Sequence, residues 1–208
     1  MNKRLAAGLG ALAALAMTTT GVAPASAGGE DPYPESEGWQ IFNFNDTLRA
    51  GYVCNVDFKA RVKGHVRVTV NGKLPPKDWK GPKPGDLVVQ ESPDATATIT
   101  NAKNRQKVKL DLAGPVYSRV SKNGKDLKSR SVGGNLYFGN GVKGLLYAKG
   151  TQWFSVYNFK DPVKVELDLH RTQGSTVELC HFLGAKAVRG KNPPPQQGQS
   201  GVAHDLTL

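Results

Sequence analysis

The chain has 208 residues, and its 28 lysines and arginines outnumber its 17 aspartates and glutamates, which gives a formal net charge of +11. This length fits one main domain, and beyond the first residues no stretch is apolar enough to be expected to cross a membrane. The excess of positive charge either favours anionic partners or serves only solubility.

The first predicted element is a cleaved secretory signal at residues 1–27. Lys3 and Arg4 precede an apolar run over residues 5–17, and the segment ends in Ala-Ser-Ala at 25–27. Such an order is typical of export signals, and the run is shorter than the ~20 residues of a membrane span. We therefore expect a secreted, extracellular protein with no membrane span after signal removal. The acidic, proline-bearing residues 28–38 are expected to form a flexible leader.

A regular alternation follows at residues 56–70. Small or apolar residues occupy the even positions, whereas mostly charged residues occupy the odd positions. A period of two predicts a strand with one face in the core and the other in water. Gly64 is the natural place for a bend in so long a strand, because glycine has no side chain to pack.

Turn signals divide the rest of the chain into short predicted strands. A proline-rich loop is expected at 71–86, and Asn123-Gly124 predicts a hairpin in which both residues adopt positive φ. Further strands are predicted at 87–90, 95–100, 107–112, 116–121, 126–132, 135–138, 145–148, 153–158, 163–169 and 176–180, with a turn at 172–174. No convincing helical period is present, so about ten short strands predict an all-β fold, an antiparallel β-sandwich or barrel.

The domain is predicted to span residues 39–183, and residues 184–208, rich in Gly, Pro and Gln, are expected to be a disordered tail. The chain has two cysteines, Cys54 and Cys180. An even count in an exported protein predicts a disulfide, which would join the early part of the domain to its end. A reactive pair is the alternative, although the spacing is not that of a Cys-x-x-Cys motif.

Three segments resemble a group of secreted all-β proteins of actinobacteria. Residues 174–183 have a similar pattern of Gly, Thr, Cys and Leu, with the threonine one place closer to the glycine. Residues 98–103 resemble that group's strand and Thr-Asn turn, and the hairpin at 123–124 lies where the group has one. The resemblance implies export, a Cys54–Cys180 bridge and a β domain, and it carries no known activity. This chain departs from the group in its basicity, its leader and its tail.

The odd positions of the strand at 56–70 supply the main candidate site. Alternate side chains are ~6.6 Å apart, less than a Debye length of ~8 Å at physiological salt, so their charges repel one another and a bound polyanion would relieve the repulsion. Lys107 and Lys109 would widen the patch if their strand pairs nearby. The candidate anion-binding residues are Lys59, Arg61, Lys63, His65, Arg67, Lys107 and Lys109. The alternative is a solvated face that cross-strand acids such as Glu166 and Asp168 neutralise.

Two smaller groups of residues suggest other roles. Trp153, Tyr157 and Phe159 share one side of a predicted strand, where exposed rings would stack on sugars, although core packing is the more common role of rings. Glu166, Asp168 and His170 would share one strand face, and His181 follows Cys180; these groups are an alternative metal site or acid–base pair. No sequence motif of a hydrolase, zinc protease or phosphate loop is present, so no catalytic residue, metal or cofactor is predicted.

These observations predict a secreted binding or structural module rather than an enzyme. It would contact anionic extracellular or cell-wall polymers, such as wall polymers or acidic polysaccharides, through the basic strand face. One alternative is an extracellular protein-interaction domain or an inhibitor whose charge is incidental. A hydrolase with an unrecognised site is the least favoured alternative.

Overall fold

The computed structural model describes residues 32–161 and 164–189. Within these residues nine strands form one antiparallel sheet in the order β5-β4-β2-β3-β6-β7-β8-β9, with β1 paired to the other side of β2. The strands are β1 (Trp39–Leu48), β2 (Phe58–Val70), β3 (Leu87–Ser92), β4 (Thr96–Asn101), β5 (Lys107–Asp111), β6 (Gly114–Val120), β7 (Leu127–Tyr137), β8 (Leu146–Tyr157) and β9 (Glu166–Glu178). Two short helical turns, η1 (Glu35–Glu37) and α1 (Leu179–Phe182), flank the sheet. The predicted all-β antiparallel fold is confirmed.

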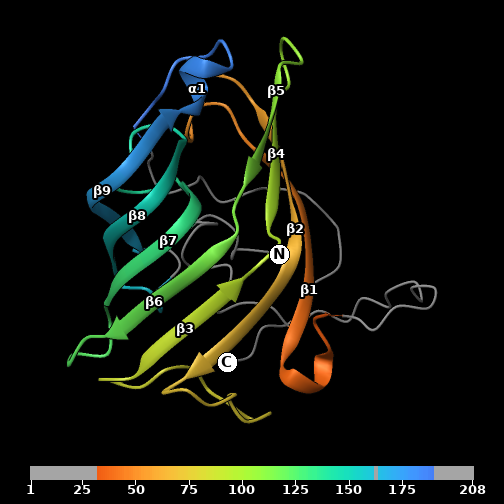
Figure 1. The fold of residues 1–208 in the computed structure, drawn as a ribbon. Coiled ribbons are helices and arrows are strands. Elements are labelled where there is room, and N and C mark those ends of the chain that lie inside the picture. Colours follow the sequence, from red (N-terminus) through yellow and green to blue (C-terminus); the bar gives the residue numbers. More distant parts are fainter. Residues whose placement is uncertain (1–31, 162–163, 190–208) are drawn as a thin grey trace.

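The sheet has two arms, which Figure 1 shows on either side of a shared interior. The first arm consists of β1, β2, β4 and β5, and the second of β3, β6, β7, β8 and β9. β2 joins them because its first half pairs with β4 and its second half with β3. Phe58 and Ile99 of the first arm pack in one core with Leu136 of the second and with Leu145, which directly precedes β8; Phe154 belongs to a second core. Full burial of each such side chain stabilises the fold by about 1.5–3 kcal/mol.

The alternation predicted for β2 is confirmed. Its even positions from Phe58 to Val62 are buried, and its odd positions from Lys59 to Lys63 are exposed. Gly64 has φ +154°, and a Cβ there would lie 2.7 Å from Cα of Ala95. The missing side chain therefore lets the β3–β4 turn cross β2 at the point where β2 changes its partner strand.

A line of glycines crosses the second arm. Gly133 of β7 is paired with Gly150 of β8, which is paired with Gly174 of β9, and their φ angles are +110°, +121° and +140°. Extended backbone at such φ is almost restricted to glycine, so the three strands depart from ordinary strand geometry along one line. The predicted turn at 172–174 is wrong because β9 continues through it. The segments predicted as strands at 126–132 and 135–138 likewise belong to the single strand β7.

Asn-Gly pairs form two different turns. Asn71 and Gly72 have φ +52° and +79°, and Val70 and Lys73 exchange backbone hydrogen bonds across them, as in a two-residue hairpin turn. The predicted hairpin at Asn123-Gly124 does join β6 and β7. Its loop is longer, however, and only Gly124 of that pair has positive φ. The predicted geometry therefore occurs at Asn71-Gly72 rather than at 123–124.

The ordered fold extends beyond both predicted boundaries. Tyr33, in the predicted flexible leader, packs its ring 5.0 Å from that of Trp39. At the other end the backbone N–H of Val188 donates to the carbonyl of Val53 at 3.0 Å, and Ala185 is buried. The predicted tail is therefore wrong for residues 184–189, which pack against the domain. The signal at 1–27, the start of the leader and residues 190–208 lie outside the described residues.

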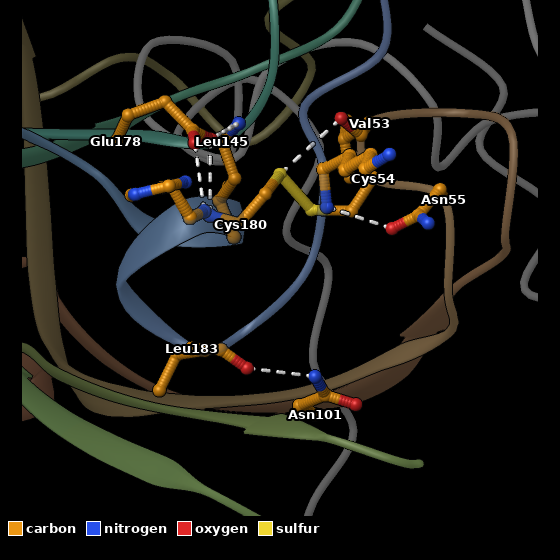
Figure 2. Close-up of a disulfide and its surroundings, with 10 residues drawn as sticks. Val53, Cys54, Asn55, Asn101, Leu145, Glu178, Cys180 and Leu183 are labelled. Atoms are coloured by element: carbon orange, nitrogen blue, oxygen red, sulfur yellow. Dashed lines mark hydrogen bonds between the residues drawn. A yellow bond between two sulfur atoms is a disulfide. The ribbon is translucent and has the colours of Figure 1, made fainter. Parts of the chain in front are cut away.

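The predicted disulfide is confirmed, and it joins the two arms (Figure 2). Cys54 lies in the β1–β2 loop and Cys180 in α1; both are fully buried. The Glu178 carboxylate accepts hydrogen bonds from the backbone N–H groups of Cys180 at 3.0 Å and His181 at 2.8 Å, which caps α1. The side-chain amide of Asn101 also joins the arms by donating to the Leu183 carbonyl at 2.8 Å.

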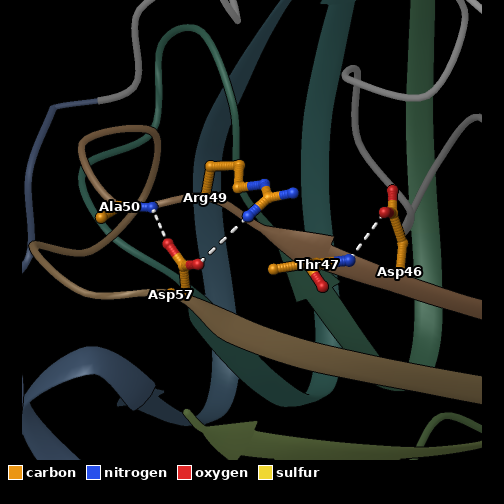
Figure 3. A network of polar contacts seen from close by, with 5 residues as sticks. All are labelled: Asp46, Thr47, Arg49, Ala50 and Asp57. Atoms are coloured by element: carbon orange, nitrogen blue, oxygen red, sulfur yellow. Dashed lines mark hydrogen bonds and ion pairs between the residues drawn. The ribbon is translucent and has the colours of Figure 1, made fainter. Parts of the chain in front are cut away.

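The β1–β2 loop that carries Cys54 is held by Asp57 (Figure 3). Its carboxylate accepts the backbone N–H of Ala50 at 2.7 Å and lies 3.4 Å from Nη1 of Arg49. A half-exposed pair of this kind adds little free energy by itself, but it fixes the loop between its two strands.

In the described part of the chain no helix is long and apolar enough to cross a membrane.

Candidate functional site

The first arm presents a row of cations on the face opposite its core. Lys59, Arg61 and Lys63 of β2 are exposed, because the odd positions of the strand point away from the buried even ones. The strand register surrounds them with short polar side chains. Their cross-strand neighbours are Thr47, Asn45 and Asn43 of β1 and Thr100, Thr98 and Thr96 of β4.

Lys107 and Lys109 of β5 lie on the same face. Thr100 is paired with Lys107 and Thr98 with Lys109, so the two lysines share rows with Lys59 and Arg61. With strands ~4.8 Å apart, the lysines lie two strands or ~10 Å across the sheet. The strand that carries Lys107 and Lys109 therefore lies close enough to β2 for the two lysines to widen the patch. We use the term basic face for Lys59, Arg61, Lys63, Lys107 and Lys109.

Within the described part of the chain, no carboxylate forms an ion pair with the basic face. Two acids lie at its border: Asp111, the cross-strand neighbour of Thr96, and Asp57, which pairs with Arg49. Glu166 and Asp168, the acids expected to neutralise the stripe, lie on β9 at the far edge of the second arm. The prediction that Glu166 and Asp168 neutralise the stripe is therefore wrong.

Arg67 belongs to the predicted stripe but has its own partners. Its guanidinium lies 4.6 Å from the centre of the Trp39 ring, and its Nε and Nη2 lie 2.9 Å and 2.7 Å from Oε2 of Glu91. The stacked guanidinium is thus already occupied by a carboxylate of the neighbouring strand β3. Arg67 therefore joins β2 to β3, and its guanidinium is less available to bind an external anion than the side chains of Lys59 and Arg61.

His65 is also held by the protein. Its backbone N–H donates to Oδ1 of Asp94, and its Nδ1 lies 2.7 Å from Oδ2 of the same carboxylate. The ring of Tyr33 packs 4.7 Å from the imidazole. Partial burial tends to raise the pKa of Asp94, but these hydrogen bonds from His65 outweigh it and lower the pKa below 3.8.

The substitution Asp94→Asn is expected to reduce the acid sensitivity of the fold. A carboxyl whose pKa is lowered by folding stabilises the protein above pH 3.8, and that contribution is lost as the pH falls through the lower, folded pKa. Loss of the charged hydrogen bonds should lower the free energy of unfolding by about 1 kcal/mol at pH 7, since the Asp94 carboxylate is partly exposed. Urea unfolding from pH 2 to pH 7 measures both effects. The control is Asp78→Asn, and an unchanged pH profile in Asp94→Asn would contradict the assignment.

The second arm has a cationic face that the sequence analysis did not single out. Tyr117, Arg130, Trp153 and Arg171 are cross-strand neighbours on β6, β7, β8 and β9, so they form one row on a single face. The guanidinium of Arg171 lies 5.1 Å from the centre of the Trp153 ring. The alternation at 127–131, with cations at 128 and 130, was a usable signal for outward charge.

The predicted platform of aromatic rings is formed only in part. Trp153 and Tyr157 point to the outer face, but Arg171 lies over the Trp153 ring. Phe159 packs against the second core, and Lys160 lies 5.5 Å from its ring centre. A continuous row of open rings is therefore not present on this strand.

A serine, a histidine and an aspartate are connected on the outer face of β8 and β9. Oγ of Ser155 lies 2.7 Å from Nε2 of His170, whose Nδ1 lies 3.4 Å from Oδ2 of Asp168. The order of contacts is that of a catalytic triad. Ser155, however, is only 5% exposed and is flanked by paired strands on both sides, so the adjacent backbone N–H groups that could form an oxyanion hole are used by the sheet.

Metal binding was the other alternative for residues 166–170. Over residues 32–161 and 164–189, no three His, Cys, Asp or Glu side chains gather as a metal site. Asp168 and His170 contact each other, and His181 lies in α1 beyond the end of β9. The structure thus brings two of the considered groups together without a third.

Comparisons with protein-family models, with curated proteins and with solved structures found no match for this chain. The resemblance to secreted proteins of actinobacteria therefore stays a prediction. The candidate site rests on the geometry of the chain itself.

Proposed function

We propose that this protein is an extracellular binding module that holds anionic polymers, such as wall polymers or acidic polysaccharides, on its basic face. The observation that carries the proposal is the set of five exposed cations on β2 and β5, which flank β4 in one sheet, with no ion-pair partner among the described residues. A linear polyanion relieves the mutual repulsion of such cations and gains entropy by releasing its counterions.

The neighbours of the cations support binding as well as attraction. Threonine hydroxyls of β4 lie between the cations, and asparagine amides of β1 lie on the other side of β2, where both can donate hydrogen bonds to the same polymer. The strands hold these groups at fixed spacing, which lowers the entropy lost on binding. A disulfide is typical of proteins that fold in oxidising compartments, which supports the extracellular location.

The basic face is tested by changing Lys59, Arg61, Lys63, Lys107 and Lys109 together to alanine. We would measure binding to four probes between 50 mM and 200 mM salt. They are double-stranded DNA, anionic vesicles, polygalacturonate and, separately, an anionic wall polymer. For a polymer that uses this face, the affinity should fall at least about tenfold, and its salt dependence should become weaker. Because the five side chains are exposed, the variant should keep its fold, which far-ultraviolet circular dichroism checks.

The matched control changes five exposed loop lysines, Lys73, Lys77, Lys80, Lys122 and Lys125, and so removes the same charge elsewhere. An equal loss of affinity in the two variants would mean that binding depends only on net charge. That result would favour the alternative of an interaction domain or inhibitor with incidental charge. Binding that disappears at 200 mM salt for every polymer would favour the same alternative.

A further inference from the structure

Two arginines of this sheet each lie over an indole ring. Arg67 lies over Trp39 at 4.6 Å, and Arg171 lies over Trp153 at 5.1 Å. In both pairs the two residues are cross-strand neighbours on one face of the sheet. An aromatic ring attracts the flat face of the guanidinium and holds it in place, which leaves the N–H groups at its edge for an acceptor.

The two pairs differ in what fills that edge. Around Arg67 it is Glu91, at 2.7 Å and 2.9 Å. Arg171 is exposed and has no carboxylate partner within the described part of the chain. The acid nearest to it in the sequence, Asp168, contacts His170 instead. Arg171 therefore lies over its ring as Arg67 does, but no carboxylate among the described residues pairs with it.

The row that ends at Arg171 favours an anionic chain of sugar rings. Arg130 flanks the other side of Trp153, and Lys128 lies on the same face beside Ser155. Tyr117 is the cross-strand neighbour of Arg130 and is 40% exposed. A planar guanidinium pairs with a carboxylate through two parallel hydrogen bonds, and an open aromatic side chain offers apolar contact to the C–H face of a sugar.

We propose that Arg171, held on Trp153, binds a carboxylate of an acidic polysaccharide, and that Arg130 and Tyr117, further along the same row, contact other sugars of the same chain. This site goes beyond the basic face, because it lies on the second arm and β3 separates it from β2. It also takes a different ligand group. The basic face attracts charge of any kind, whereas the Arg171 site matches one planar carboxylate.

The test uses a short galacturonate oligomer, with its methyl ester as the neutral control of the same sugar. Nitrogen-15 labelling of the arginine side chains lets NMR follow Nε–H of Arg171 and of Arg67 separately. The galacturonate oligomer should shift the Arg171 signal and leave that of Arg67 in place, and the ester should shift neither. Arg171→Lys keeps the charge but loses the planar fork, so it should weaken binding about tenfold, whereas Arg67→Lys should not change the affinity.

Three results would overturn the proposal. The first is an unchanged Arg171 signal in the wild-type protein, and the second is equal weakening by Arg67→Lys and Arg171→Lys. The third is a shift of the same size with inorganic phosphate at equal concentration, which would mean general anion binding. In the variant lacking all five cations of the basic face, the Arg171 response should persist. Its persistence separates a failure of this site from a failure of the basic face.

Discussion

Replacement of Cys54 and Cys180 by alanine is expected to lower the free energy of unfolding by about 2–5 kcal/mol. The bridge closes a loop of 126 residues, so its loss gives the unfolded chain much more conformational freedom. It also joins the β1–β2 loop to α1, and thereby the first arm to the end of the second. Chemical denaturation of the wild-type protein and the double variant measures the difference. The dependence of stability on denaturant should steepen, because an unfolded chain without the cross-link exposes more surface.

A control separates the cross-link from the packing around it. Glu178→Ala removes the cap of α1 but leaves the bridge, and it should cost only about 1 kcal/mol. If the double cysteine variant were no less stable than Glu178→Ala, the cross-link would not be the element that holds the arms together. Reduction of the wild-type protein under native conditions should be slow, since both sulfur-bearing residues are fully buried.

Patterns that depend on burial within one strand could be predicted from the sequence. The alternation of β2 identified its inward and outward residues correctly, because a strand with one buried face imposes a period of two on its own sequence. The same reasoning placed Lys107 and Lys109 outward, and pairing of β5 with β4 brought them to the same face. The disulfide followed from the cysteine count.

Features that depend on strand order and register could not be predicted in this way. Glu166 and Asp168 alternate as expected, but whether they lie beside Lys59 is decided by the position of β9 in the sheet. The carboxylate partners of Arg67 and His65 come from β3 and the β3–β4 turn, which no local pattern connects to them. The stacking of Arg171 on Trp153 likewise required the register of β8 and β9.

The wrong prediction of a turn at 172–174 has a physical reason. A glycine between polar residues is typical of a turn, so residues 172–174 were assigned to one. Glycine is equally required where an extended strand adopts positive φ and another backbone approaches closely. Gly133, Gly150 and Gly174 meet that second requirement, and local sequence alone does not distinguish the two. The outcome was an expectation of several short strands where the sheet has long ones.

The line of glycines yields the second large prediction. Gly150→Ala should lower the free energy of unfolding by about 3 kcal/mol or more. A Cβ at Gly150 would lie 2.2 Å from the carbonyl oxygen of Gln173, and φ is +121°. The obstructing atom belongs to the backbone of the paired strand, so relief requires β8 and β9 to separate locally. Thermal and urea unfolding measure the loss.

Gly72→Ala is the matched control, because it isolates backbone strain from the close approach. Gly72 also has positive φ, at +79°, but a Cβ there would meet nothing within 4 Å. This variant should therefore lose only about 1–2 kcal/mol, the cost of left-handed backbone for an ordinary residue. Equal losses at the two positions would mean that φ alone explains the glycine line. A much larger loss at Gly150 would show that the second arm depends on three strands passing closer together than any side chain allows.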